Sequence, residues 1–120
     1  FRWSAIKCRD QKLSNRSFLT PIFEAYGFTE AAGSVTSTAI WDRRGGHVGG
    51  TLPCNRMQLR DVPELNISTS STPPSGCIYI KGNSVMKGYF KDPEKTREIL
   101  GEDGWLKIGD VGILNKNGSI

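Results

Sequence analysis

The stretch Tyr26-Gly27-Phe28-Thr29-Glu30 constrains the chain most, because it places an aromatic ring, a glycine, a hydroxyl and a carboxylate within five residues, shortly after the apolar run 21–23. A glycine that follows a strand lets the backbone turn sharply and approach a ligand closely. A nearby threonine can donate to a phosphoryl oxygen, and a glutamate can hold Mg²⁺, which prefers hard oxygen ligands. The same letters also fit a strand-to-helix turn with a threonine cap, so both interpretations stay open.

Two later stretches favour the first interpretation. Residues 81–90 contain two glycines and a tyrosine, and residues 105–110 begin at a tryptophan and are predicted to end in a Gly109-Asp110 turn. The carboxylate of Asp110 offers two acceptor oxygens. It therefore suits the two hydroxyls of a ribose, as acidic residues do in dinucleotide-binding folds.

With these three stretches in this order, the chain resembles the AMP-forming acyl-CoA synthetases, members of the adenylate-forming superfamily. The matching signatures are Y-G-x-T-E, G-x(5)-G-Y and W-x-x-x-G-D, and the resemblance extends over residues 22–120. Residues 60–66 also look like the V-P-E-[ML]-N segment common in eukaryotic long-chain fatty acyl-CoA synthetases. The resemblance therefore implies a long-chain fatty acid as substrate.

The resemblance implies a function for each of five residues. Thr29 would donate to the α-phosphate of ATP, and Glu30 would coordinate Mg²⁺; these two are the expected catalytic residues. Tyr26 would stack on adenine, and the backbone of Gly27 would line the pocket where the acyl carbonyl and the phosphate meet. Asp110 would accept hydrogen bonds from both ribose hydroxyls.

Five further motif residues are implied to be structural. They are Gly82, Gly88, Tyr89, Trp105 and Gly109. We expect Gly88 and Tyr89 to fix a turn beside a helix, and Trp105 to pack mainly in the core. Ile108 departs from the family, in which threonine is usual, and the missing hydroxyl predicts weaker ATP binding.

The implied fold class is α/β for the parent protein, of which this chain would be a fragment of the large N-terminal domain. The fragment would consist mostly of a small β-subdomain with one or two short helices. Residues 1–20 would be a divergent basic segment, residues 21–47 the end of the α/β part, and residues 48–120 a β-rich subdomain that ends before the hinge and the C-terminal domain. The family's phosphate loop, hinge and adenylation lysine would lie elsewhere, so the fragment alone is predicted to be inactive.

Local patterns predict several elements independently of the resemblance. Residues 57–62 alternate between apolar and polar side chains, which indicates a strand, and residues 77–81, mostly apolar and bounded by two glycines, indicate a second strand. Asp92 followed by Pro93, with Gly101 beyond, predicts a short surface helix. Asn117-Gly118 predicts a hairpin turn.

Charge and cysteine content restrict the remaining classes. The net charge of +4 comes from the first twenty residues, where five basic residues face one acidic residue. Such a run could contact an anionic surface or form a solvated face, but the sequence lacks the interleaved aromatic and basic residues of an RNA-binding sheet, so no nucleic-acid partner is expected. The three cysteines form no C-x-x-C pair and indicate reduced thiols in an intracellular protein.

The sequence therefore predicts part of a long-chain fatty acid–CoA ligase that uses ATP, Mg²⁺ and coenzyme A to form acyl-AMP and then acyl-CoA. Fatty acid, ATP and CoA would be its small-molecule substrates. The cytoplasmic face of the endoplasmic reticulum or another organelle membrane is a candidate location for the parent. The alternatives are an adenylate-forming enzyme for another carboxylic acid and a non-catalytic binding module that retains the motifs.

Overall fold

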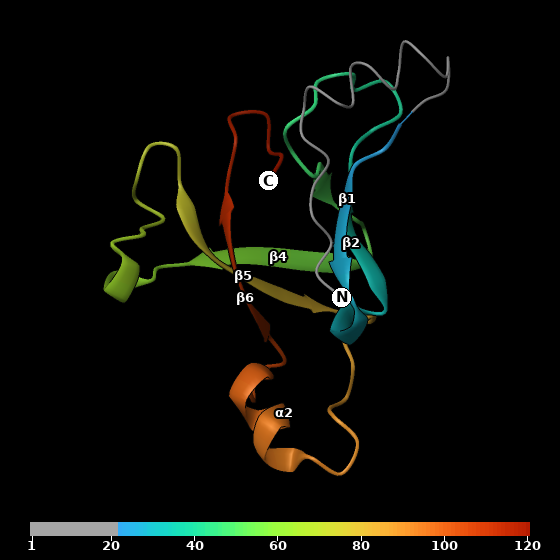
Figure 1. The fold of residues 1–120 in the computed structure, drawn as a ribbon, viewed down its shortest axis with the longest axis vertical. Helices are drawn as coiled ribbons and strands as arrows, with labels where there is room; N and C mark the ends of the chain where they lie inside the picture. Colours follow the sequence, from blue (N-terminus) through green and yellow to red (C-terminus); the bar gives the residue numbers. More distant parts are fainter. Residues whose placement is uncertain (1–21) are drawn as a thin grey trace.

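A computed structural model describes residues 22–120 as two antiparallel three-stranded sheets with little helix (Figure 1). The first sheet has the order β1-β2-β3 and the second the order β4-β5-β6. Their bounds are β1 Ala25–Phe28, β2 Gly33–Ser37, β3 Gly50–Thr51, β4 Asn55–Arg60, β5 Ser75–Gly82 and β6 Leu106–Ile113. The fragment was expected to be mostly a small β-subdomain, and these sheets fit that expectation. The basic segment 1–20 lies outside the described residues.

The core lies where the two sheets meet. In Figure 1, β1 and β2 run across the direction of β4, and a short connection leads from β3 into β4. Val35 of β2 and Ile80 of β5 are fully buried and belong to one apolar cluster, against which Tyr26 and Phe28 of β1 pack. Burial of these side chains drives the association of the sheets, so the first motif is attached directly to the core.

The helix α2, Pro93–Ile99, connects β5 to β6 and begins as its sequence predicts. The side chain of Asp92 accepts a hydrogen bond from the amide of Lys95 at 3.0 Å, and Pro93 occupies the first turn. The helix also ends where its sequence predicts: Leu100 takes the cap position with an extended backbone, and Gly101 follows it, its amide donating to the carbonyl of Trp105. Within residues 22–120, no helix is long and apolar enough to cross a bilayer.

The hairpin of β1 and β2 corrects two expectations. Tyr26 and Gly27 lie within β1 rather than at a turn that follows a strand, and a register shift separates them. The small, hydroxyl-rich composition of residues 30–39 suits a pocket floor or a loop, but residues 33–37 within it form β2. The 3-10 turn η1, Thr29–Ala31, connects the two strands, so the first motif spans a strand and a tight turn.

The predicted Gly109-Asp110 turn is a bulge inside one continuous strand. Cys77 of β5 pairs with Val111 of β6, and Tyr79 pairs with Lys107, so residues 108–110 stand opposite Ile78 alone. Gly109 has φ of 86°, a left-handed conformation that glycine adopts at little cost. The bulge displaces Asp110 from the regular ladder.

The turn at Asn117-Gly118 forms, with Gly118 at φ of 82° and a hydrogen bond from its amide to Asn115 at 2.9 Å. Beyond the turn, Ile120 does not form the returning strand of a hairpin with β6. Ile120 exchanges backbone hydrogen bonds with Val48 and Gly49, at 2.8 and 3.0 Å. The backbone of Ile120 is therefore hydrogen-bonded to the segment before β3.

Candidate functional site

The β6 bulge brings Asp110 to the first motif. The hydroxyl of Tyr26 donates to Oδ2 of Asp110 at 2.8 Å, although the two residues are 84 positions apart in the sequence. Burial of the half-buried phenol, together with this hydrogen bond, raises the pKa of Tyr26 above its ordinary value. The phenol is therefore a stable donor, and it fixes the orientation of an otherwise exposed carboxylate.

A second tyrosine holds the other carboxylate of the site. The hydroxyl of Tyr89 donates to Oε1 of Glu30 at 2.6 Å, across 59 positions of sequence. This hydrogen bond lowers the pKa of the Glu30 carboxyl and raises that of the Tyr89 phenol. Glu30 is thus held as an ionised acceptor.

Phe28 connects the two tyrosine–carboxylate pairs. Its ring centroid lies 5.8 Å from that of Tyr26, with the planes inclined at 60°. It also borders a cavity of about 200 Å³. The side chains around this cavity are Phe28, Glu30, Tyr89, Ile99, Leu106, Lys107 and Ile108. The three sequence motifs therefore meet in one region of the molecule.

Each carboxylate keeps one oxygen free for a ligand within the described part of the chain. Oδ2 of Asp110 and Oε1 of Glu30 are taken by the phenols, while residues 22–120 provide no side-chain donor to Oδ1 or Oε2. The arrangement can accept hydrogen bonds at Asp110 and can offer a carboxylate oxygen to a cation at Glu30. An aromatic surface from Tyr26 and Phe28 lies between them.

The donor set at Glu30 fits Mg²⁺ that is bound mainly by a nucleotide. Mg²⁺ usually takes one or two carboxylates and completes its shell with waters and substrate phosphates. Glu30 could supply one such carboxylate, and no group of three His, Cys, Asp or Glu residues gathers in residues 22–120. Residues 22–120 therefore do not form a metal site made only of protein ligands.

Thr29 does not cap a helix. The cap position of η1 belongs to Phe28, no side chain makes a capping hydrogen bond there, and Thr29 itself is exposed. The capping interpretation of the first motif is wrong. The hydroxyl of Thr29 is available to solvent beside Glu30.

Gly27 is required by the packing of the hairpin. A Cβ atom at this position would overlap the backbone carbonyl of Gly33 and lie 2.6 Å from Cα of Ser34. Close approach of a ligand to the Gly27 backbone was the reason expected from the sequence. The structure supplies a second reason within the protein, because the backbone of the neighbouring strand β2 lies where a side chain at this position would be.

The three glycines expected to be structural occupy positions that constrain the residue type, whereas Trp105 is less buried than expected. A Cβ at Gly82 would lie 2.5 Å from the carbonyl of Cys54, and Gly88 has φ of 149° with Thr96 2.8 Å from where its Cβ would be. Gly109 has open space around it and needs only its φ. Trp105 is half-buried rather than fully in the core.

Sequence reasoning missed three contributions. Phe28 occupies the variable position of Y-G-x-T-E, and the motif gave no sign of its contact with Tyr26. The hydroxyl of Tyr89 was overlooked because the residue was read as part of a turn. Arg60 lies with its guanidinium carbon 4.1 Å from the ring centroid of Tyr79 and 5.8 Å from that of Trp105, a contact between residues far apart in sequence.

The family model described as AMP-binding enzyme matches residues 9–90. Among curated proteins, the chain is 48% identical to long-chain-fatty-acid–CoA ligase 5 of Mus musculus over 99 residues, which is 82% of this chain and 14% of the ligase. It is 45% identical to fatty acyl-CoA synthetase A of Dictyostelium discoideum over 104 residues, 86% of this chain and 16% of the synthetase. The chain therefore spans a small part of the length of these relatives.

Solved structures show the same fold. Apo MatB from Rhodopseudomonas palustris aligns with a TM-score of 0.78 and 30% identity over 97% of this chain and 23% of MatB. The A domain of carboxylic acid reductase from Segniliparus rugosus, in complex with AMP and a co-purified carboxylic acid, aligns with a TM-score of 0.80 and 26% identity. That alignment covers 97% of this chain and 17% of the reductase chain. The expected α/β adenylate-forming parent fold is confirmed.

Proposed function

Because the chain belongs to the AMP-binding enzyme family, we propose that it forms part of a long-chain fatty acid–CoA ligase. Such an enzyme joins the carboxylate of a fatty acid to the α-phosphorus of ATP and releases pyrophosphate. It then transfers the acyl group from acyl-AMP to the thiol of CoA. The identity to ligases of mouse and Dictyostelium supports the fatty acid as substrate.

One observation carries the proposal: two carboxylates from different motifs are each held by a tyrosine within one region. Tyr26 holds Asp110, and Tyr89 holds Glu30, at 2.8 and 2.6 Å. Within residues 22–120, the fold itself does not use the second oxygen of either carboxylate. A nucleotide could use both oxygens, one for its ribose hydroxyls and one for its Mg²⁺.

At the nucleoside end, Asp110 would accept from the ribose hydroxyls. Because Oδ2 already accepts from Tyr26, Oδ1 is the better placed acceptor, and the second hydroxyl would share Oδ2. The ring of Tyr26, tilted against Phe28, would offer one face to adenine. The hydrogen bond to Asp110 fixes the ring plane, so that stacking requires little reorganisation.

At the phosphate end, the exposed hydroxyl of Thr29 would donate to the α-phosphate, where negative charge builds during attack by the fatty acid carboxylate. Glu30 would hold Mg²⁺ through Oε2. When bound, the ion would neutralise phosphate charge and polarise the phosphorus centre. Thr29 and Glu30 are adjacent in η1, so the donor and the cation ligand would be oriented together.

We further propose that residues 21–47 contribute the end of the α/β part and residues 48–120 the β-rich subdomain of a longer ligase. The remaining phosphate, hinge and CoA contacts would come from segments outside this sequence. The isolated chain would then be inactive, and ATP–pyrophosphate exchange by the isolated chain would contradict this. The proposed substrate, a long-chain fatty acid, is the only ground for predicting that the parent associates with a membrane.

The test is ATP–pyrophosphate exchange by the full-length protein with palmitate, octanoate, benzoate and phenylalanine. Preference for palmitate is expected, whereas preference for another acid would favour the alternative adenylating enzyme. The Asp110→Asn variant should raise the KM for ATP about tenfold, the effect of losing a hydrogen bond to a charged group.

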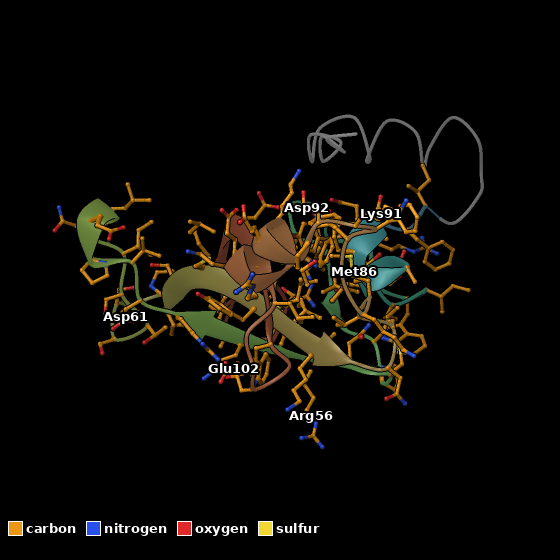
Figure 2. The ribbon with its side chains drawn as sticks, turned by 90° about the horizontal axis from the view of Figure 1, so that it is seen from below. Arg56, Asp61, Met86, Lys91, Asp92 and Glu102 are labelled. Carbon is orange, nitrogen blue, oxygen red and sulfur yellow. The ribbon has the colours of Figure 1, made fainter. Side chains whose placement is uncertain are left out.

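Asp61→Asn is the matched control, because Asp61 binds Thr69 at 2.7 Å in a loop at the opposite end of the molecule from Met86 (Figure 2). Its KM should stay within twofold of that of the unmodified protein. An equal effect of both variants, or no exchange with any of the acids, would contradict the proposed function.

A further inference from the structure

We propose that Tyr89 is a positioning residue for Glu30: its hydroxyl holds one carboxylate oxygen so that the other is presented to the Mg²⁺ of the nucleotide. This inference rests on the proposed function of Glu30 as the metal ligand. It gives the tyrosine of G-x(5)-G-Y a function beyond fixing a turn.

The contact itself is short and charge-assisted. The phenol donates to Oε1 of Glu30 at 2.6 Å, within the range of O–H···O⁻ hydrogen bonds, which are about twice as strong as neutral ones. A free glutamate side chain loses rotamer freedom when it binds a cation. Because Tyr89 orders the carboxylate beforehand, metal binding need not supply that ordering.

The backbone of Glu30 is tied to the same loop as its side chain. The amide of Met86 donates to the carbonyl of Glu30 at 2.8 Å, three residues before Tyr89. Figure 2 shows Met86 beside η1, on the side of the molecule that carries Lys91 and Asp92. Residues 86–89 therefore hold Glu30 at two points, which fixes both the position of its Cα and the direction of its carboxylate.

Tyr89 is in turn fixed by the first turn of α2. Its amide donates to Oγ1 of Thr96 at 2.9 Å, and that hydroxyl donates onward to the carbonyl of Asp92 at 2.7 Å. The ammonium of Lys95 lies 5.1 Å from the centroid of the Tyr89 ring. At Gly88, a side chain would collide with Thr96.

These contacts form a continuous path from α2 to Glu30. The helix exposes most of its surface and buries no residue completely, so core packing does not explain it. The helix instead holds the backbone of Tyr89 through Thr96 and places the ammonium of Lys95 near its ring, so we infer that it helps to keep the phenol at Glu30. Partners of this kind typically change metal affinity tenfold or more when they are removed.

The experiment uses the full-length protein and measures ATP binding calorimetrically over a range of Mg²⁺ concentrations, and again in excess EDTA. Tyr89→Phe removes only the hydroxyl. It should raise the Mg²⁺ concentration needed for half-maximal enhancement of binding about tenfold, with the Kd in EDTA unchanged within twofold. Tyr79→Phe is the matched control, because the Tyr79 ring packs against Arg60 and should leave both quantities unchanged.

Thr96→Val supplies a second variant that keeps the Tyr89 hydroxyl but removes its anchor. It should shift the Mg²⁺ requirement in the same direction by a smaller factor. If Tyr89→Phe leaves the Mg²⁺ requirement unchanged, or weakens binding equally in EDTA, the positioning inference is overturned.

Glu30→Gln separates this inference from the proposed function. If Glu30→Gln raises the Mg²⁺ requirement and Tyr89→Phe does not, the positioning inference alone fails. If Glu30→Gln has no effect on the requirement, Glu30 is not the metal ligand, and the function assigned to it fails as well.

Discussion

Replacing Gly27 with alanine tests why Y-G-x-T-E contains a glycine. The added Cβ would overlap the carbonyl oxygen of Gly33 and lie 2.6 Å from Cα of Ser34, closer than the 3.0 Å that real Cβ atoms essentially never breach. Both contacts are with backbone atoms, so no rotamer change relieves them. The strand β2 would have to move away from β1.

The cost follows from this geometry. Overpacking a well-packed region costs about 1–3 kcal/mol, and displacement of a paired strand places Gly27→Ala near the upper value, about 3 kcal/mol. Gly50→Ala is the matched control, since Gly50 lies in β3 of the same sheet with open space where its Cβ would be. A surface substitution of this kind changes stability by about 0.5 kcal/mol or less.

Hydrogen–deuterium exchange of β2 measures this local effect in the full-length protein. If Gly27→Ala destabilises the hairpin by about 3 kcal/mol, the protection of the β2 amides against exchange should fall about a hundredfold, at 1.4 kcal/mol per factor of ten. Gly50→Ala should change protection by less than about threefold. Equal protection in the two variants would refute the steric reasoning. Loss of ATP binding with protection intact would instead show that the glycine serves the ligand.

Two further predictions concern the parts that support Glu30. Asp92→Ala removes the acceptor for the amide of Lys95 and should destabilise α2 by about 1 kcal/mol. The amides of α2 should then exchange with deuterium about fivefold faster. Unchanged hydrogen–deuterium exchange would mean that the cap contributes nothing to the stability of the helix. The pKa of Glu30 lies below its ordinary value of 4.5, chiefly because of the Tyr89 hydrogen bond, so its ionised form stabilises the fold. That contribution is present above about pH 4.5 and is lost as the pH falls through the lowered pKa. The melting temperature of the Glu30→Gln variant should therefore fall less on acidification than that of the unmodified protein. An identical pH dependence of the two melting temperatures would contradict this.

Elements with strong local signals could be predicted from the sequence. Alternation over residues 57–62 marked most of β4, the mostly apolar stretch 77–81 marked β5, and the Asp92-Pro93 pair marked the start of α2. In each case the side-chain period or the cap chemistry determines the local backbone, so the pattern is readable without knowledge of the neighbours.

The remaining elements depend on contacts between distant residues. The small residues of β2 have weak strand preference, and they form a strand because β1 pairs with them and Val35 is buried in the core. The bulge in β6 follows from its register with β5, which the Gly109-Asp110 pair alone does not specify. The motifs identified Tyr26, Glu30 and Asp110 as candidates, but their tyrosine partners emerge only from the assembled sheets.

The two tyrosine–carboxylate pairs also bear on the order in which the protein folds. Each joins residues separated by 59 or 84 positions, whereas the β1–β2 hairpin closes within a few residues. Contacts across long separations must overcome a larger loop-closure entropy, and proteins rich in such contacts fold more slowly. The candidate site is then completed only after both sheets have docked, so that competence to bind nucleotide reports that this part of the chain has reached its native topology.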